Sequence, residues 1–177
     1  SQNHSVSMSG GSSKSNYRAS FSYLDRNGIM RDNAMERYSF RFQFSQRAIN
    51  DRLKVGLTGS ATLTDNQVPN GDNFVLAYSM LPVYPVYNED GSYFTKVNKE
   101  FDQGNPVQNQ NLNTMSNKMN YFYGNGDIQF LVMEGLNVKA NLYKSRFNGE
   151  FSQYTDSNTS MGYKDQGFAK KQNSAWD

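Results

Sequence analysis

The side chains that most often carry out catalysis or bind metals are scarce in this sequence. Cysteine is absent and His4 is the one histidine, which excludes thiolate metal sites and histidine clusters and argues against a serine–histidine–aspartate triad. Asn88-Glu89-Asp90-Gly91 has the oxygen ligands that calcium prefers but lacks the spacing of an EF-hand loop, and it is typical of a β-turn. We therefore expect no catalytic residue, no metal site and no cofactor.

A second group of residues has the chemistry to bind a neutral polar ligand. Tyrosine rings stack on sugar rings, and their hydroxyl groups form hydrogen bonds. Several such rings fall close together near Pro82 and Pro85, so they could equally form a small core that stiffens a long loop. The residues expected to bind a substrate or a partner are Tyr78, Tyr84, Tyr87, Asn88 and Tyr93.

Composition excludes several classes of protein. The 177 residues include 18 basic and 16 acidic side chains, and a net charge of +2 offers no electrostatic footprint for nucleic acid. Asn, Gln, Ser and Thr make up 60 residues, yet 14% of the chain is aromatic, which disfavours disorder. No apolar run approaches the roughly 20 residues that a transmembrane helix requires.

Apolar and polar side chains alternate at every second position over several stretches, which is the pattern of β-strands with two unlike faces. The clearest stretch sets Phe40, Phe42 and Phe44 against Arg41 and Gln43. Most stretches are about 10 to 15 residues long, whereas strands of globular proteins commonly have about 5–6 residues. The pattern predicts six strands, at residues 4–9, 16–25, 36–46, 53–64, 119–133 and 136–147.

The alternation also predicts which side chains share a face of the sheet, because a one-residue slip would move every side chain to the other face. One face is expected to carry Phe40, Phe42, Leu57, Ile128, Val138 and Leu142. The opposite face is expected to carry Arg41, Gln43, Thr58, Gln129 and Asn141.

Short and long connections alternate between the predicted strands, and the long loops fall at about 26–35, 65–118 and 148–170. An antiparallel meander places all the long loops on one rim and all the short turns on the other. Together with long strands, this asymmetry is typical of outer-membrane β-barrels. A soluble β-sandwich is the alternative, although its strands are usually shorter and its loop lengths do not separate by rim.

Specific words in the sequence resemble the early barrel of SusC/RagA-type TonB-dependent outer-membrane transporters. They keep their order and are distributed over most of the length of residues 3–147. The words are HSVSMSGG at 4–11, NYRASFSYLDRNGI at 16–29, ERYSFR at 36–41, NDRLKVG at 50–56, PVYNEDGSY at 85–93, NPV at 105–107 and EGLNVK at 134–139.

The resemblance implies a 22-stranded transmembrane barrel around a plug, in the outer membrane of a Gram-negative bacterium. Such transporters import glycans or peptides with energy from the TonB complex, and a SusD-like surface lipoprotein forms their lid. Residues 1–177 would form part of the barrel after the plug, an all-β antiparallel meander with long loops on the extracellular rim and outward side chains against lipid. Six strands cannot close so wide a barrel, so we expect a fragment.

Charged residues at polar positions of the strands are expected to face the lumen of such a barrel. They could guide a substrate, bond to the plug, or simply form a solvated wall. These residues are Arg18, Arg41, Lys54, Asp127 and Lys139.

The sequence therefore predicts part of a nutrient importer and not an enzyme. The alternative is a soluble β-rich module on the cell surface that binds glycans or acts as an adhesin. The surroundings of the apolar face distinguish these two functions. In a barrel this face meets lipid, so the purified protein would need detergent, whereas a soluble module would not.

Overall fold

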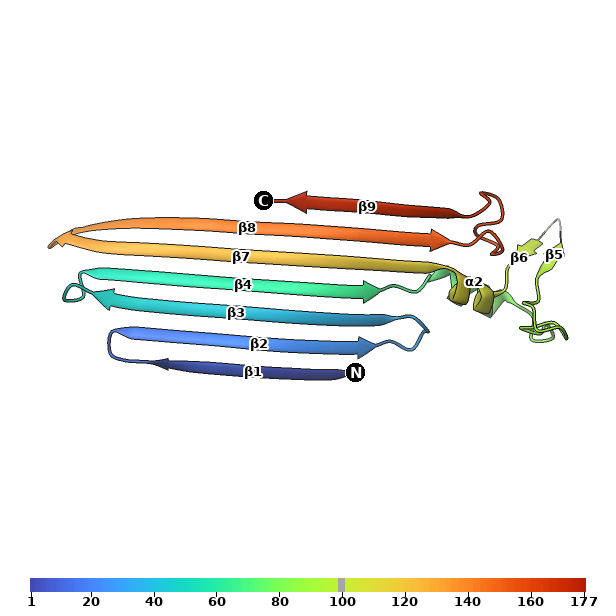
Figure 1. The fold of residues 1–177 in the computed structure, drawn as a ribbon, viewed down its shortest axis with the longest axis horizontal. Coiled ribbons are helices and arrows are strands. Elements are labelled where there is room, and N and C mark those ends of the chain that lie inside the picture. The colour runs from blue at the N-terminus through green and yellow to red at the C-terminus, as the bar shows by residue number, and fades with distance from the viewer. Residues whose placement is uncertain (99–100) are drawn as a thin grey trace.

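Seven strands form one antiparallel sheet, and each strand pairs with the next of the seven along the chain (Figure 1). The computed structural model describes residues 1–98 and 101–177. The strands of the sheet are β1 (Gln2–Gly11), β2 (Ser15–Asn27), β3 (Ala34–Ala48), β4 (Leu53–Gln67), β7 (Thr114–Met133), β8 (Leu136–Thr155) and β9 (Phe168–Trp176). The prediction of an all-β antiparallel meander is confirmed.

The chain between β4 and β7 contains four short elements that the sequence did not predict. They are α1 (Asp72–Ser79), β5 (Lys96–Asn98), β6 (Phe101–Gln103) and α2 (Pro106–Leu112). The loop predicted at 65–118 is thus a folded insertion, of which residues 99 and 100 lie outside the described residues.

The strands run further than predicted, mostly toward the rim with the long loops. β8 continues to Thr155 instead of ending near residue 147, and β9 lies partly inside the loop predicted at 148–170. The added residues of β8 are mostly polar on both faces, so they show no alternation. Pairing of the backbone with β7 and β9 forms this part of the sheet instead.

Connection lengths separate by rim, as the meander predicts. The short connections, residues 12–14, 49–52 and 134–135, lie at one end of the sheet (Figure 1). The described residues of the long connections, 28–33, 68–98, 101–113 and 156–167, lie at the other end.

The strand register places the two predicted sets of side chains on opposite faces. Residues directly opposite each other share a face, and Phe42 pairs with Ala19 and with Gly59. Following the register across β4, β7 and β8 puts Leu57, Ile128, Val138 and Leu142 on the face of Phe40 and Phe42. Arg41, Gln43, Thr58, Gln129 and Asn141 lie on the other face. The prediction of faces is confirmed, and we call them the apolar face and the polar face.

No hydrophobic side chain of the described residues is buried. Leu142 is 79% exposed, Ile128 is 50% exposed and Phe40 is 48% exposed, all on the apolar face. A soluble domain is stabilised mainly by burying such surface against a second layer of structure. Within the described residues the sheet has no second layer, so its apolar face is suited to an apolar surrounding.

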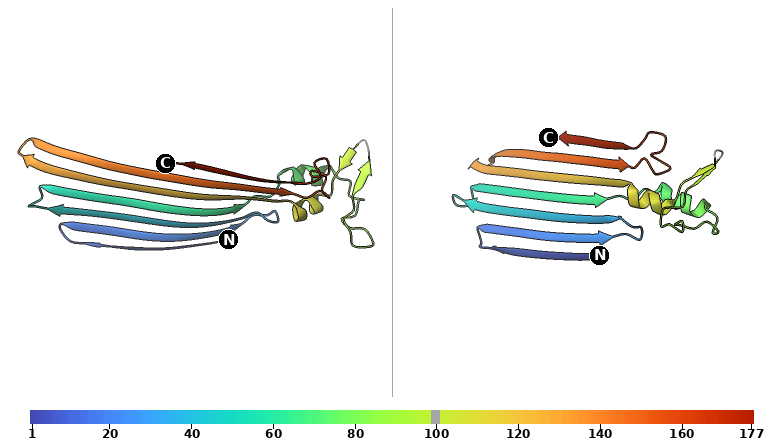
Figure 2. Two further views of the ribbon diagram at one scale, coloured as in Figure 1. Left: turned by 45° about the horizontal axis from the view of Figure 1, so that its top comes forward. Right: turned by 45° about the vertical axis from the view of Figure 1, so that its right-hand side comes forward.

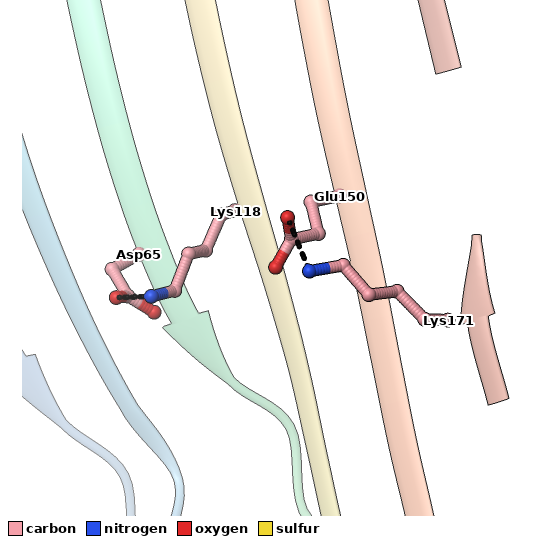
Figure 3. Close-up of polar contacts among 4 residues, drawn as sticks. All are labelled: Asp65, Lys118, Glu150 and Lys171. Atoms are coloured by element: carbon pink, nitrogen blue, oxygen red, sulfur yellow. Dashed lines mark ion pairs between the residues drawn. The ribbon is translucent and has the colours of Figure 1, made fainter. Parts of the chain in front are cut away.

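A row of charged side chains limits the apolar face toward the long-loop rim. The register aligns Asp25, Glu36, Asp65, Lys118 and Glu150 across five neighbouring strands. Lys118 Nζ lies 3.4 Å from Asp65 Oδ2, and Lys171 Nζ lies 3.0 Å from Glu150 Oε2 (Figure 3). These exposed ion pairs each contribute only about 0–1 kcal/mol. Their main consequence is to end the apolar surface.

Arg52 joins two hairpins on the short-turn rim. Its Nε donates to the Leu131 carbonyl over 3.0 Å, and its Nη2 donates to the Val132 carbonyl. The pairing of β7 is irregular between Leu131 and Met133. Arg52 therefore satisfies carbonyl groups where the regular ladder is interrupted.

Substitutions at neighbouring positions of β3 should separate the two faces energetically. We predict that Phe42→Arg lowers the free energy of unfolding in a bilayer by about 2–4 kcal/mol, because it places a charge near the middle of the apolar face. Gln43→Arg, on the polar face, should cost far less. Refolding titrations into lipid vesicles measure both values, and equal costs would contradict the assignment of faces.

Candidate functional site

The three long connections meet beyond one end of the sheet, with α2 among them (Figures 1 and 2). We call residues 28–33, 68–98, 101–113 and 156–167 the outer loop cluster. Its buried side chains are amides and a hydroxyl rather than hydrocarbons, namely Asn73, Asn105, Gln108, Asn109 and Thr159. Burying a polar group costs free energy unless the group is hydrogen-bonded. The hydrogen bonds of these side chains therefore specify how the loops pack.

Asn105 is the most connected of these residues and is only 2% exposed. Its Oδ1 accepts hydrogen bonds from the backbone N–H groups of Val107 and Gln108, at 3.0 and 3.2 Å, and so caps α2. Its Nδ2 donates to the carbonyls of Val86 and Phe94, at 2.7 and 3.1 Å. One side chain thereby fixes the hairpin around residues 86–94 to the start of the helix.

The next residues of α2 bind the other two loops. Gln108 Nε2 donates to the carbonyl of Asn158 over 2.9 Å, and Asn109 Nδ2 donates to Ser160 Oγ over 3.1 Å. Gln110 Nε2 donates to the carbonyl of Arg31 over 3.0 Å. The helix therefore links all three long connections through amide side chains.

The structure places three of the five predicted loop residues, Tyr87, Asn88 and Tyr93, in that hairpin, and a fourth, Tyr84, packs against it. The rings of Tyr87 and Tyr93 lie 5.3 Å apart and their backbones form a β-bridge. Tyr84 stacks on Phe94 with ring centroids 5.8 Å apart. Asn88 Nδ2 donates to Ser92 Oγ over 2.8 Å. These contacts support the interpretation that the rings stiffen the loop.

Tyr78 differs from the other predicted residues. It lies in α1 and is 93% exposed, so its whole ring faces outward from the helix. Phe74 and Val75 of the same helix are also more than half exposed. Of the predicted binding residues, Tyr78 therefore offers the largest free surface to a partner.

Two acidic side chains of the cluster hold tight turns. The Ser92 hydroxyl donates to Asp90, and this hydrogen bond holds the pKa of the Asp90 carboxyl below its ordinary value of 3.8. The backbone N–H of Asn158 donates to Asp156 over 2.8 Å and lowers the pKa of that carboxyl in the same way. Both groups act as acceptors in turns rather than as acids or bases.

The predicted lumen-facing residues all lie on the polar face, and they reveal a strong asymmetry of charge. By register, the strands of the sheet place eight cations and one carboxylate, Asp127, on this face. The cations are Arg18, Arg26, Arg37, Arg41, Arg47, Lys54, Lys139 and Lys170. On the apolar face the same strands carry four carboxylates and four cations.

A row of aromatic rings also lies on the polar face. Tyr121 pairs with Phe147, and Phe147 pairs with Trp176. The Phe147 and Trp176 rings are stacked with centroids 5.4 Å apart, and Tyr121 lies 6.1 Å from Trp176. Nearby, the Tyr123 and Tyr143 rings meet edge to face at 5.3 Å.

The sequence interpretation missed this row and the organising role of α2. Tyr123 and Tyr143 stood at polar positions of predicted strands, but Trp176 had no place because β9 was not predicted. Asn105-Pro106 was a usable signal for α2, because asparagine is a favoured N-cap and proline is favoured at the first helical position.

Among the residues that the structure describes, no helix is long and apolar enough to cross a membrane. In the same part of the chain, no group of three or more His, Cys, Asp or Glu side chains is arranged to hold a metal ion.

Comparison with known proteins gives one similar curated protein. No protein-family model matches the chain. TonB-dependent receptor P26 of Formosa agariphila is 31% identical over 162 residues. The match covers 88% of this chain and 16% of that receptor, so the chain spans about one sixth of the relative's length.

Two solved structures share the fold. The RagAB peptide importer is 26% identical with a TM-score of 0.66, and the match covers 88% of this chain and 18% of that chain. The RagAB peptide transporter is 24% identical with a TM-score of 0.68, covering 88% of this chain and 19% of that chain. Together with the curated relative, these likenesses confirm the resemblance to SusC/RagA-type TonB-dependent transporters.

Two substitutions should separate the roles of Asn105. Asn105→Ala removes four hydrogen bonds and should lower the local opening free energy of the hairpin and of the start of α2 by about 2–3 kcal/mol. Asn105→Asp keeps the cap and loses the donors, so only residues 86–94 should open. Hydrogen exchange measures both regions, with Asn111→Ala as a control that removes a single exposed amide contact to the Tyr93 hydroxyl. Identical patterns in the two Asn105 variants would contradict these roles.

The turn at residues 88–92 should depend on pH in a defined direction. The lowered pKa of Asp90 stabilises the turn above the ordinary carboxyl pKa of 3.8, and this contribution is lost as the pH falls through the lower folded value. Hydrogen exchange of the Ser92 amide should therefore lose protection only in strong acid, relative to an Asp90→Asn control. The same pH dependence in that control would contradict the role of the carboxylate.

Proposed function

We propose that this chain, a segment of a SusC/RagA-type TonB-dependent transporter, forms part of the barrel wall of an importer in the outer membrane of a Gram-negative bacterium. The observation that carries the proposal is a sheet of long strands whose apolar face is exposed while no hydrophobic side chain of the described residues is buried. Lipid suits such a face because its side chains are apolar and strand pairing satisfies the backbone between the edge strands β1 and β9. In a complete barrel, further strands would pair with these two edges.

In this placement the polar face lines the lumen and the long connections lie outside the cell. The predicted lumen-facing residues Arg18, Arg41, Lys54, Asp127 and Lys139 would then meet the plug or the passing solute. The aromatic row of Tyr121, Phe147 and Trp176 adds a stacking surface to the same wall.

The imported solute is proposed to be a peptide or a glycan. Similarity to the RagAB peptide importer supports a peptide, and the tyrosine and amide side chains of the outer loop cluster suit either solute. Energy would come from the TonB complex through parts of the transporter other than these residues.

A SusD-like surface lipoprotein is the proposed partner of the outer loop cluster. Tyr78, Phe74 and Val75 present exposed apolar surface on α1, and protein interfaces are enriched in such aromatic anchors. Tyr84, Tyr87, Asn88 and Tyr93 would act mainly by holding the hairpin in the shape that meets the lid or the solute.

The soluble surface module is the weaker candidate, because it would leave the apolar face in water. Solubility separates the two functions directly. If the chain is part of a barrel, the full-length protein needs detergent and shows heat-modifiable migration on gels. A soluble binding module would be monodisperse in plain buffer.

Deleting residues 70–113 from the full-length protein should weaken uptake or lid docking and leave the barrel folded. Two residues suffice to connect two strands, and closing a longer loop costs only about 0.6 kcal/mol per doubling, so stability does not account for this insertion. β4 and β7 pair over residues 53–67 and 116–130, which the deletion leaves intact.

Energised uptake in cells and recovery of the lipoprotein in pull-downs measure the effect. Tyr78→Ala is the finer variant, since it removes one exposed ring without touching the amide contacts of α2. Heat-modifiable migration is the control for folding. Wild-type uptake and wild-type partner recovery in the deletion strain would together contradict a functional role of this loop.

A further inference from the structure

The near-neutral net charge of the chain conceals a positively charged wall. The polar face holds eight cations against one carboxylate, whereas the charges of the apolar face balance. The described residues form four ion pairs, and none of them includes a cation of the polar face. This face therefore has an excess of positive charge that the sheet itself does not neutralise.

A small hollow lies where two of these cations are neighbours. Arg18 of β2 is opposite Gln43 of β3, and Ser20 is opposite Arg41, so the two arginines are one diagonal step apart on adjacent strands. These four residues line a hollow of about 160 Å³. We call it the arginine notch.

The chemistry of the notch favours an oxyanion. Diagonal neighbours on adjacent strands lie within reach of long side chains, so the two guanidinium groups repel each other. Arginine does not lose its proton at any physiological pH. Each guanidinium offers several N–H donors in a planar fork that matches a carboxylate or sulfate, and Ser20 and Gln43 add a hydroxyl and an amide donor. A bound oxyanion would use these donors and relieve the repulsion.

The notch continues into a larger hollow toward the short-turn rim. This second hollow, of about 530 Å³, shares Arg18 and Gln43 with the notch. Its lining also includes Lys14, Arg47 and Lys54. The one carboxylate, Asp127, lies against Gly56, where the absence of a Cβ leaves room for it. Cations thus extend from the notch along the face, which suits a solute with several acidic groups.

We propose that the arginine notch binds a carboxylate or sulfate group of the imported solute, and that the transporter therefore prefers acidic solutes to neutral ones of the same size. The proposal rests on the proposed function, because it needs the polar face to line the lumen. It goes beyond that function by assigning a subsite and the charge of the ligand.

The test is binding of defined probes to the full-length protein purified in detergent. Labelled hexaglutamate and hexaglutamine form one matched pair, and tetragalacturonate and its methyl ester form another, so the two arms distinguish a peptide carboxylate from a sugar carboxylate. In at least one arm the acidic probe should bind more tightly than its neutral partner. The double substitution Arg18→Gln and Arg41→Gln should lower the affinity for that acidic probe by about tenfold and leave the affinity for the neutral probe unchanged.

The double substitution Lys144→Gln and Arg146→Gln is the matched control, because it also removes two positive charges, but from the apolar face. This control should bind both probes as the wild type does. Three results would overturn the proposal: no preference for the acidic probe in either arm, unchanged acidic binding in the arginine variant, or equal loss of acidic and neutral probes.

A further result would show that the notch binds a carboxylate of the transporter itself and not of the solute. If the arginine variant binds acidic probes normally but melts at a lower temperature, the notch holds a carboxylate of the transporter itself and the solute proposal is wrong. Binding in detergent does not require TonB. Failure of energised uptake would therefore count against the proposed function without altering the charge preference measured here.

Discussion

The rest of the structure depends on the two-residue period of the strands. Backbone pairing in the sheet sends neighbouring side chains to opposite faces, so one register assigns Phe42 and Gln43 to different surroundings. The apolar face has no protein layer against it within the described residues, and the polar face carries the unbalanced charge of the sheet. A membrane barrel accommodates both faces, because lipid covers one and water or a plug meets the other.

In the outer loop cluster, hydrogen bonds of amide side chains hold the loops together, and no hydrophobic side chain of its described residues is buried. The loops of this cluster are mostly irregular chain, and amide side chains at the start of α2 and within it hold them in place. Asn105, Gln108 and Gln110 donate hydrogen bonds to the backbone carbonyls of Val86, Asn158 and Arg31, respectively. Directional hydrogen bonds specify a single arrangement, whereas a small apolar cluster would tolerate several. This hydrogen-bonded cluster presents Tyr78 outward without a buried hydrophobic side chain among its described residues.

Charge follows the same division between faces. The cations of the apolar face form ion pairs: Lys118 with Asp65, Lys171 with Glu150, and Lys144 and Arg146 with Asp177. The arginines of the polar face form no ion pair within the described residues, although the chain has 16 carboxylates for 18 cations. The two faces of the sheet together carry twelve cations and five carboxylates, whereas the rest of the chain carries six cations and eleven carboxylates. The net charge of +2 therefore gave no warning of this separation.

The sequence by itself determined the class of fold, the faces of the strands and the rim of each loop, because side-chain alternation and connection length are local properties of a chain. It did not determine residues 148–155 of β8 or the existence of β9. In both segments the side chains do not alternate, and pairing with neighbouring strands forms the structure. Nor did it determine that Asn105 would reach Val86, or that Tyr121 would meet Trp176. Those contacts join residues far apart in the chain, and only the register and the packing of the loops bring them together.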